Sequence, residues 1–544
     1  IRASDGLDGT GITIGIMSDS YDNLGGEAAD IASGDLPNDV TVLLDLGSGG
    51  IDEGRAMAQL VHDIVPNADL LFRTAFLGQA DFANGIGQLV AAGADVITDD
   101  IFYFAEPFFQ DGVIAQAADQ AVADGVAYYT SAGNSSDNSY EATYSNSGQT
   151  ITYTNNNNVS VTGTLHDFDA GAGVDTTQSL TFQAGGSFTL GFQWDNPFSS
   201  ISAGSGGAIE DYDILLTDNT GAIIANLSAS SSTIGGDPVE IFQIDNNGAS
   251  AVQANLSIVR TNQGAQATDN FIKYVLYRSG GVAVNEFDTQ SSTAVGHSNA
   301  ADAISVGAAF FGQTPEFGLS PPRLESFSSV GRTDIFFDTN GARLATPEQR
   351  VSPDLVGVDG SNNTFFGSDT GADADSNPNF FGTSAAAPNV AAVAAQLLQF
   401  NPNLTPAEIN AALAATAIDM DDPRTAGFDV GIDAATGAGL IDAAAALEFI
   451  RPSGGAIVGT NGGETLTGSG ADDVIQGLGG DDILQGLGGS DDLQGGDGAD
   501  QLFGGLGADT PTGGLGDDVY FVDDSRDIVS ELLNEGTNRV EAEV

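Results

Sequence analysis

A nine-residue period near the C-terminus restricts the fold of this chain more than any other feature. Seven consecutive units begin with glycine, from Gly459 to Gly513, and each carries an acid at its sixth position and, with one proline exception, an aliphatic or aromatic residue at its eighth. Glycines at fixed positions permit tight turns that other residues adopt with difficulty. Apolar residues at a fixed position can fill a core between short strands. Seven units in phase favour a parallel β-helix over a flexible, acidic, glycine-rich linker.

This period resembles the RTX calcium-binding nonapeptide repeat. The resemblance implies a β-roll within residues 455–544, export by type I secretion machinery, and folding driven by calcium outside the cell. Carboxylate and carbonyl oxygens at the turns are the hard ligands that calcium prefers. Glu464 replaces the first aspartate and Pro511 interrupts the apolar position, so we expect the end turns to be weak or to act as caps. The expected calcium ligands are Asp473, Asp482, Asp491, Asp500, Asp509 and Asp518.

A second informative segment is the Gly-Thr-Ser turn at residues 382–384, which runs into a stretch of small residues that is expected to be helical. This pattern predicts that Ser384 lies at a helix N-terminus. Free backbone N–H groups and the helix dipole favour negative charge there, and an alkoxide or an oxyanion is such a charge. The alternative is that Ser384 only caps the helix, which serine often does.

Residues 382–391 resemble the nucleophile segment of the subtilases, the subtilisin-like serine proteases. Residues 11–22 resemble the first core strand of that family, which ends in the catalytic aspartate, here Asp19. Residues 126–134 resemble the strand and loop that deliver the oxyanion-hole asparagine, here Asn134. The resemblance implies that Ser384 is the nucleophile, with Asn134 and the Ser384 N–H holding the oxyanion.

The resemblance covers residues 1–135 and 295–450 and implies a subtilisin-like α/β fold around a parallel sheet. Alternating strand and helix patterns agree with that fold, in which functional side chains gather at the carboxyl ends of the strands. The expected strands lie near residues 11–17, 69–75, 95–98, 126–130 and 303–308. The expected helices lie near residues 53–64, 80–92, 112–124, 384–399, 406–415 and 440–449.

One position departs from the subtilases. They carry a catalytic histidine at the start of the helix that follows the aspartate strand, and Glu53 stands there in this chain. The glutamate resembles the sedolisins, serine-carboxyl proteases of the same fold that use Glu and Asp with Ser. That second resemblance is partial. Met57 occupies the place of the sedolisin aspartate, and Asn134 occupies the place of their oxyanion aspartate.

The chemistry of Glu53 depends on its neighbours. A lone exposed glutamate is a poor base at neutral pH, whereas two close carboxylates share a proton and one apparent pKa rises. We therefore expect Asp19 to orient Glu53 and share its proton, and Glu53 to act as base and then acid for Ser384 at acidic to mildly acidic pH. Asp99 and Asp100 end a strand at the substrate cleft. Asp100 is a further candidate that polarises Glu53 or binds substrate, unless both are simple loop acids.

None of the three histidines is expected to replace the catalytic histidine of the subtilases. His62 follows Glu53 by nine residues, about two and a half helical turns, and should face elsewhere. His166 and His297 lie far along the chain. We expect all three to be structural, with His297 packing or capping ahead of a core strand.

The region between the two subtilase-like parts has a different pattern. Residues 136–294 contain at least seven short β-branched or alternating segments separated by turn residues, which predicts an inserted antiparallel β-sandwich. The expected strands lie near residues 150–153, 159–162, 179–182, 188–194, 212–216, 239–244 and 271–277. It resembles the jelly-roll-like accessory domains of secreted bacterial proteases. Such a domain guides substrate, binds carbohydrate or protein, or only adds stability. Asp211, Asp213 and Asp218 there are either calcium ligands or solvated loop acids.

The net charge of the chain argues against some classes of binding partner. The chain has 75 acidic and 14 basic residues and a net charge of −61. Such a surface repels nucleic acid and anionic lipid and suits a saline medium. There is no cysteine, so no disulfide can form. No apolar run of membrane-spanning length appears, so we expect no stable membrane insertion. Ile1 in place of methionine indicates a processed or trimmed N-terminus.

Together these features predict a secreted, extracellular serine endopeptidase that acts on proteins or peptides and binds calcium. Two alternatives remain open because the histidine is missing. One is an inactive binding or adhesion protein of subtilase fold, and the other is a protease restricted to cutting its own propeptide.

Overall fold

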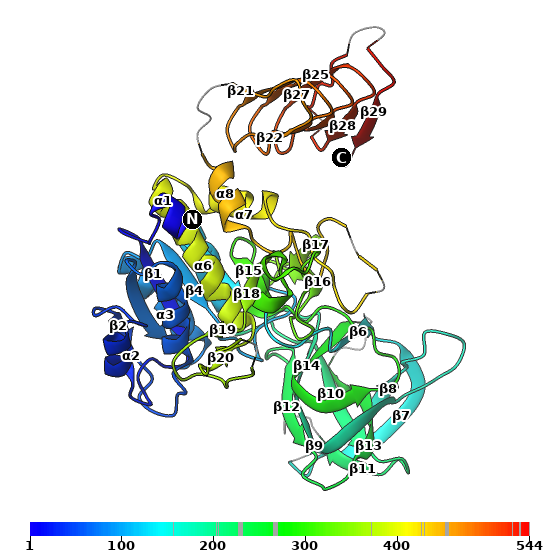
Figure 1. Ribbon diagram of the computed structural model, residues 1–544. Coiled ribbons are helices and arrows are strands. Elements are labelled where there is room, and N and C mark those ends of the chain that lie inside the picture. Colours follow the sequence, from blue (N-terminus) through cyan, green and yellow to red (C-terminus); the bar gives the residue numbers. More distant parts are fainter. Residues whose placement is uncertain are drawn as a thin grey trace.

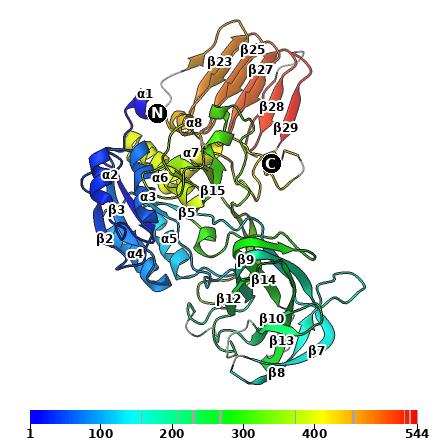
Figure 2. The ribbon, with the colours of Figure 1, turned by 60° about the horizontal axis from the view of Figure 1, so that its bottom comes forward.

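The structure is a computed structural model of residues 1–544 (Figure 1). In both views the C-terminal strands stack beside helices α7 and α8, and the strands inserted into the α/β part lie at the opposite end of the molecule (Figures 1 and 2). The description covers every residue except 156, 203, 205, 227–231, 265–269, 372, 426, 429, 452–455, 525, 532–534 and 543–544.

The α/β part of the chain is built on a seven-stranded sheet in the order β18-β15-β5-β4-β1-β3-β2. Every neighbouring pair of these strands is parallel. The sequence-based prediction of a parallel α/β core is therefore confirmed. The strands are β1 (Thr13–Ser18), β2 (Thr41–Leu44), β3 (Asp69–Thr74), β4 (Val96–Asp99), β5 (Ala127–Ser131), β15 (Ile304–Phe310) and β18 (Leu355–Asp359).

Helices surround this sheet, and α6 is the most deeply buried of them. Its small side chains let it approach the sheet closely: a Cβ on Gly357 of β18 would lie 2.6 Å from the Ala386 carbonyl oxygen. A helix that is apolar on all sides is expected in the interior of a protein, and α6 is buried as far as Leu398. The helices are α1 (Arg2–Asp5), α2 (Glu27–Ser33), α3 (Glu53–Ile64), α4 (Gln79–Ala91), α5 (Val113–Ala123), α6 (Thr383–Phe400), α7 (Pro406–Ala415) and α8 (Ala443–Phe449).

The starting residues of the last two helices are set by N-terminal capping. The side chain of Thr405 and that of Glu408 form a capping box at the start of α7, with Pro406 at the first helical position. The helix expected from residue 440 begins at Ala443 because the Asp442 side chain accepts two backbone N–H groups of the next turn. In the described part of the chain, no helix is both long and apolar enough to cross a bilayer.

The inserted strands form, within the described residues, one nine-stranded sheet whose recorded pairings are antiparallel. The segments expected at 179–182 and 188–194 are one long strand, β9, which pairs with β13 in its first half and β12 in its second. Strand β13 was not predicted. The strands are β6 (Ser139–Thr143), β7 (Asn146–Thr154), β8 (Ser160–His166), β9 (Gln178–Trp194), β10 (Glu210–Thr217), β11 (Ile223–Asn226), β12 (Val239–Asp245), β13 (Val252–Gly264) and β14 (Phe271–Val284).

Short elements join these parts. They are the 3₁₀ helices η1 (Gly296–Asn299), η2 (Phe311–Gln313) and η3 (Pro315–Phe317), the hairpin of β16 (Gly331–Phe337) and β17 (Arg343–Ser352), and the small pair of β19 (Ser361–Asn362) and β20 (Asn379–Phe380).

The repeats form two parallel ladders, β21-β23-β25-β27 and β22-β24-β26-β28-β29. Residues eighteen apart pair, as Leu484 does with Leu502, so each ladder takes every second repeat. Pro511 is buried and keeps this register opposite Leu493, so the expectation that it interrupts the core position is wrong. A proline fits there because its carbonyl still accepts the Ser530 N–H. The ladder strands are β21 (Ile457–Val458), β22 (Thr465–Thr467), β23 (Val474–Gly479), β24 (Ile483–Gln485), β25 (Asp492–Asp497), β26 (Gln501–Phe503), β27 (Thr510–Leu515), β28 (Val519–Val522) and β29 (Arg539–Ala542).

Candidate active site

The candidate catalytic residues come from five different elements. Asp19 follows β1, Asp100 follows β4, Asn134 follows β5, Glu53 begins α3 and Ser384 lies in the first turn of α6. Glu53, Asp100, Asn134 and Ser384 line one cavity of about 290 Å³. The carboxyl ends of parallel strands meet at one edge of a sheet, which brings these distant residues together.

Ser384 is the second residue of α6 and does not cap it. The N-cap position belongs to Gly382, whose φ of 116° favours glycine, and no side chain caps the helix. The Gly382 N–H donates to Asp359 Oδ2 over 2.8 Å, which fixes the turn ahead of the serine. The alternative in which Ser384 is only a cap is therefore wrong. As the second residue of α6, Ser384 lies at the positive end of the helix dipole, where negative charge is favoured.

Asn134 presents its amide N–H groups to the same cavity. Its Oδ1 accepts hydrogen bonds from the Thr383 backbone N–H and hydroxyl, each over 3.0 Å. Among the described residues, no protein acceptor receives a hydrogen bond from the Asn134 Nδ2. With the amide oxygen held by α6, the side chain leaves its two N–H donors for a ligand, which is the requirement for stabilising an oxyanion.

Asp19 is buried, and its carboxylate accepts hydrogen bonds from backbone amides. Its carboxylate accepts from the N–H groups of Ser20 over 2.5 Å, Ile51 over 2.6 Å and Glu53 over 2.9 Å. The contact between Asp19 and Glu53 therefore runs through the Glu53 backbone. Asp19 holds the start of α3 at the end of β1.

Asp100 is the carboxyl group that faces Glu53. It is 8% exposed, and its pKa is raised well above the ordinary value, first by burial and next by the Glu53 carboxylate, with Asp19 adding to the rise. Neither of its carboxyl oxygens has a hydrogen-bond partner among the described residues. Two neighbouring carboxyl groups cannot both ionise freely, so such a pair retains a proton to higher pH than a lone carboxyl group does. The arrangement can therefore hold a shared proton beside Ser384.

His297 belongs to a buried ionic cluster behind the cavity. Its Nε2 lies 3.1 Å from Asp99 Oδ1 and its Nδ1 lies 2.8 Å from Glu106 Oε2. Burial opposes its charge, but Glu106 and Asp99 outweigh burial and raise the His297 pKa to about 10. Asp99 is thus an ion-pair partner rather than a solvated loop acid. The cluster ties the end of β4 to Glu106 and to η1, and Asp99 does not line the cavity that Asp100 lines.

The other two histidines are also remote from the cavity lining. Burial lowers the pKa of His62, which lies on α3, and lowers the pKa of His166 to about 4. His166 contacts the Tyr140 hydroxyl and the Ser145 N–H inside the inserted sheet. No histidine lines the described cavity that contains Ser384.

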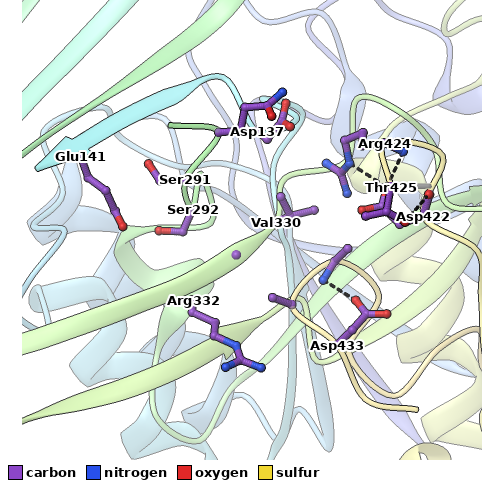
Figure 3. A pocket seen from close by; sticks show the side chains of 14 residues that line it. Asp137, Glu141, Ser291, Ser292, Val330, Arg332, Asp422, Arg424, Thr425 and Asp433 are labelled. Atoms are coloured by element: carbon purple, nitrogen blue, oxygen red, sulfur yellow. Dashed lines mark hydrogen bonds and ion pairs between the residues drawn. The ribbon is translucent and has the colours of Figure 1, made fainter. Parts of the chain in front are cut away.

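A larger cavity of about 500 Å³ lies elsewhere, where the inserted strand β6 meets β16 and the loop after α7. Figure 3 shows Glu141, Arg332, Arg424 and Asp433 around it. Its lining mixes acids and arginines and includes none of the candidate catalytic residues. Size alone does not locate the chemistry, and the smaller cavity at Ser384 has the reactive groups.

The repeats carry a second set of buried acids. One oxygen of most of these carboxylates accepts the N–H of the residue eighteen positions earlier, as Asp509 Oδ1 does from Asp491 over 2.9 Å. Among the described residues the other oxygen has no protein partner, which is costly for a buried carboxylate unless a cation is bound. The orphaned oxygens belong to the six predicted ligands, Asp473, Asp482, Asp491, Asp500, Asp509 and Asp518.

These carboxylates fit calcium. Burial first, and neighbouring aspartates after it, raise the pKa of Asp491 to about 7 and those of Asp500 and Asp509 to about 6. A divalent cation would relieve both causes. Asp523 and Asp527 lie beyond the nine-residue period and were not predicted, yet their ligand oxygens and one of Asp509 all lie within 4.8 Å of one another. Glu464 accepts from the Thr460 N–H and hydroxyl and so closes its own end turn.

The acids singled out in the inserted sheet are engaged in other contacts. Asp211 accepts from Thr233 and Thr261, and Asp218 accepts backbone N–H groups of its own turn. Asp213 accepts from the Tyr153 hydroxyl. Within the described residues these three acids form no shared cation site.

Comparisons with known proteins identify the family of the chain. The model of the subtilase family matches residues 51–439, well over half of the chain, and the model of the RTX calcium-binding nonapeptide repeat matches residues 458–493 and 485–520. The chain belongs to the subtilase family and is a serine-type endopeptidase. The subtilase match begins after Asp19.

Similar solved structures are distant. The CspB protease of Clostridium perfringens is 13% identical, with 82% of this chain and 94% of that chain covered and a TM-score of 0.45. Fervidolysin from Fervidobacterium pennivorans, a keratinolytic enzyme related to subtilisin, is 16% identical, with 84% and 47% covered and a TM-score of 0.32. A search of curated proteins found no match.

Proposed function

We propose that this subtilase is a secreted endopeptidase with a serine-carboxyl centre that works at acidic to mildly acidic pH. The observation that carries the proposal is the cavity that joins Ser384, Glu53, Asp100 and Asn134 without a histidine. Glu53 occupies the first position of α3, where subtilases carry their catalytic histidine and sedolisins a glutamate.

In the proposed reaction, Ser384 Oγ attacks the peptide carbonyl while Glu53 takes the hydroxyl proton. Asn134 Nδ2 and the Ser384 N–H donate to the oxyanion that forms. Glu53 then returns the proton to the leaving amine as the C–N bond breaks and an acyl-enzyme ester remains. Water attacks this ester with Glu53 again as base, which restores the serine and releases the acid product.

Asp100 is proposed to share the proton of Glu53. This role was expected for Asp19, but the hydrogen bonds of the Asp19 carboxyl are to backbone N–H groups, whereas the buried Asp100 lines the cavity with Glu53, and the Glu53 carboxylate raises its pKa. Asp19 is a positioning residue that holds the start of α3. A proton held between Glu53 and Asp100 would be lost as the pH rises, which supports an acidic optimum.

The remaining parts suggest where the enzyme works. The RTX repeats and their orphaned carboxylates support calcium binding by a β-roll within residues 455–544, export by a type I system and action outside the cell. We propose that residues 1–135 and 295–450 form the peptidase domain and that residues 136–294 form a sandwich-like inserted domain. Strands β6 to β14 fall within that last range.

The test is hydrolysis of denatured casein from about pH 3 to pH 9 with millimolar calcium. Wild type is compared with Ser384→Ala, Glu53→Gln and a control, Glu316→Gln, whose side chain is exposed away from the cavity. We expect activity at acidic pH that the first two substitutions reduce by roughly 10² or more and the control does not change. A maximum well above pH 7.5 would overturn the carboxylate mechanism.

A second candidate function rests on the missing histidine. If wild type shows no cleavage dependent on Ser384 at any pH, the chain is a binding or adhesion protein that kept the fold. If only a tethered propeptide is cut, the protease is restricted to self-processing.

A further inference from the structure

The wall of the candidate active site is aromatic and comes from two parts of the chain. Phe102 and Phe104 lie in the loop after β4, and Tyr277 lies on β14 of the inserted sheet. All three side chains line the cavity that contains Ser384, as does Phe76, which is 50% exposed. The insertion therefore contributes directly to the catalytic cavity.

The three rings pack against one another. Phe104 stacks on Tyr277 with ring centroids 4.9 Å apart, and Phe102 lies 5.2 Å from Tyr277. Phe102 and Phe104 meet edge to face at 5.4 Å. Tyr277 is only 2% exposed, whereas both phenylalanines are partly exposed. Tyr277 is thus the buried support on which the two exposed rings rest, and such ring pairs prefer these geometries.

The loop that carries the phenylalanines is bound to the inserted sheet as well. Gln193 of β9 accepts from the Phe108 N–H over 2.8 Å and donates to the Glu106 carbonyl over 2.7 Å. A Cβ on Gly191 would lie 2.9 Å from the Tyr277 ring and 3.4 Å from the Phe104 carbonyl oxygen. This close approach leaves no room for a larger residue at position 191 of β9. The loop rests directly on the strand.

From these contacts we infer that the inserted domain is part of the substrate-binding cleft and that Tyr277 is a specificity-determining residue. The inference deepens the proposed endopeptidase function and rests on it. The pocket takes a large apolar side chain, aromatic or branched aliphatic, of an unfolded polypeptide close to the bond that is cut. Rigid aromatic rings offer such a side chain a large contact area.

The negative charge in the cavity also affects which substrate side chains the pocket accepts. Glu53 and Asp100 lie in the same cavity, and the buried Asp99 and Glu106 lie behind its wall with His297. Glu53 therefore repels an acidic substrate side chain in this pocket, and rejection through like charge adds to selection through apolar contact. We expect the order apolar, then small, then acidic for the residue that enters the pocket.

The experiment uses the full chain with calcium and three unfolded peptides that differ at one position, Phe, Ala or Glu. The variants are Tyr277→Ala, Tyr277→Phe and Phe104→Ala. Leu276→Ala is the matched control, because Leu276 neighbours Tyr277 on β14 but is buried in the core of the inserted sheet. Melting temperatures are measured for each variant.

We expect Tyr277→Ala and Phe104→Ala to lower kcat/KM for the Phe peptide about tenfold or more, mainly through KM, and to affect the Ala peptide much less. Tyr277→Phe should stay within about twofold, because the ring remains. Leu276→Ala should keep the wild-type order of the three peptides. An unchanged order in folded Tyr277→Ala, or a wild-type preference for the Glu peptide, overturns the inference.

A binding measurement separates this inference from the proposed function. The same labelled peptides are titrated into Ser384→Ala, with and without Tyr277→Ala. Tighter binding of the Phe peptide that is lost with Tyr277→Ala supports the pocket even if wild type cleaves nothing, in which case only the proposed function fails. Equal binding of the three peptides to Ser384→Ala refutes the pocket whatever the activity.

Discussion

Asp359 binds the turn that precedes Ser384, and its burial makes the charged form of its carboxyl group unfavourable. It ends β18, is fully buried, and accepts the Gly382 N–H on Oδ2, while Oδ1 has no protein partner among the described residues. Burial raises its pKa from 3.8 to about 7, with the Glu325 carboxylate adding to the rise and the Gly382 N–H opposing it. The folded protein therefore binds this proton more tightly than the unfolded chain does.

The size and sign of the effect follow from linkage. A difference of about three pH units between folded and unfolded states corresponds to about 4 kcal/mol at most. Since the folded pKa is the higher one, the stability contributed by protonated Asp359 is fully present below about pH 4. It is lost as the pH rises to about 7.

Asp359→Asn removes this titration and keeps an oxygen that can accept the Gly382 N–H. We expect the variant to be more stable than wild type at pH 8, by up to about 4 kcal/mol less the cost of burying an unpaired amide N–H, and nearly equal to wild type or less stable at pH 4. The assay is urea unfolding in a Ser384→Ala background at saturating calcium. The helical circular-dichroism signal reports on the α/β part, which contains all the described α-helices.

A companion variant tests the cause. Glu325→Gln removes one like charge and should recover a smaller part of the stability at pH 8 without a comparable effect at pH 4. The reasoning is refuted if Asp359→Asn is less stable than wild type at pH 8, or if the difference between them is the same at pH 4 and pH 8.

Three further predictions concern other charges. Asp100→Asn should move the alkaline fall of kcat/KM to higher pH. Asp100 is protonated only below its raised pKa, whereas asparagine has no proton to lose there. An unchanged pH profile would contradict proton sharing between Asp100 and Glu53. Calcium chelation should unfold the repeats, seen by scattering, and Asp509→Asn should raise the calcium midpoint for refolding, since one ion at a hundred times its Kd adds about 2.7 kcal/mol. His297→Gln should lower the unfolding free energy by about 3–5 kcal/mol, measured by urea, since two buried carboxylates lose their cation.

Sequence patterns were sufficient wherever local geometry decides the outcome. Alternating strands and helices predicted the parallel sheet, and the Gly-Thr-Ser turn predicted Ser384 at a helix start. The nine-residue period predicted buried positions such as Leu493 because each unit repeats the same turn. The period did not predict a role for Asp527, because the regular spacing of glycines ends before it. Asp527 nevertheless continues the eighteen-residue hydrogen-bond pattern, since it accepts the Asp509 N–H.

Patterns failed where tertiary packing decides. Spacing places Asp19 and Asp100 at neighbouring strand ends but does not say which side chain turns toward Glu53. The position of Tyr277 in the wall of the cavity could not be predicted either, because it depends on β14 of the insertion returning to the α/β part. The break expected between residues 182 and 188 does not exist, since β9 continues through a glycine pair and exchanges one partner for another.

A fold that normally carries histidine at the start of α3 must solve two problems when glutamate replaces it. The base must be held near the serine, and the amides between Asp19 and the start of α3 provide that anchor. The base must also have a drive to take a proton, and a buried second carboxyl, Asp100, can supply it by like-charge repulsion. The anchor at Asp19 does not depend on the shared proton, but the second device does, because the pair of Glu53 and Asp100 loses that proton as the pH rises. We therefore expect the enzyme to be confined to acidic conditions by the same pair that activates Ser384.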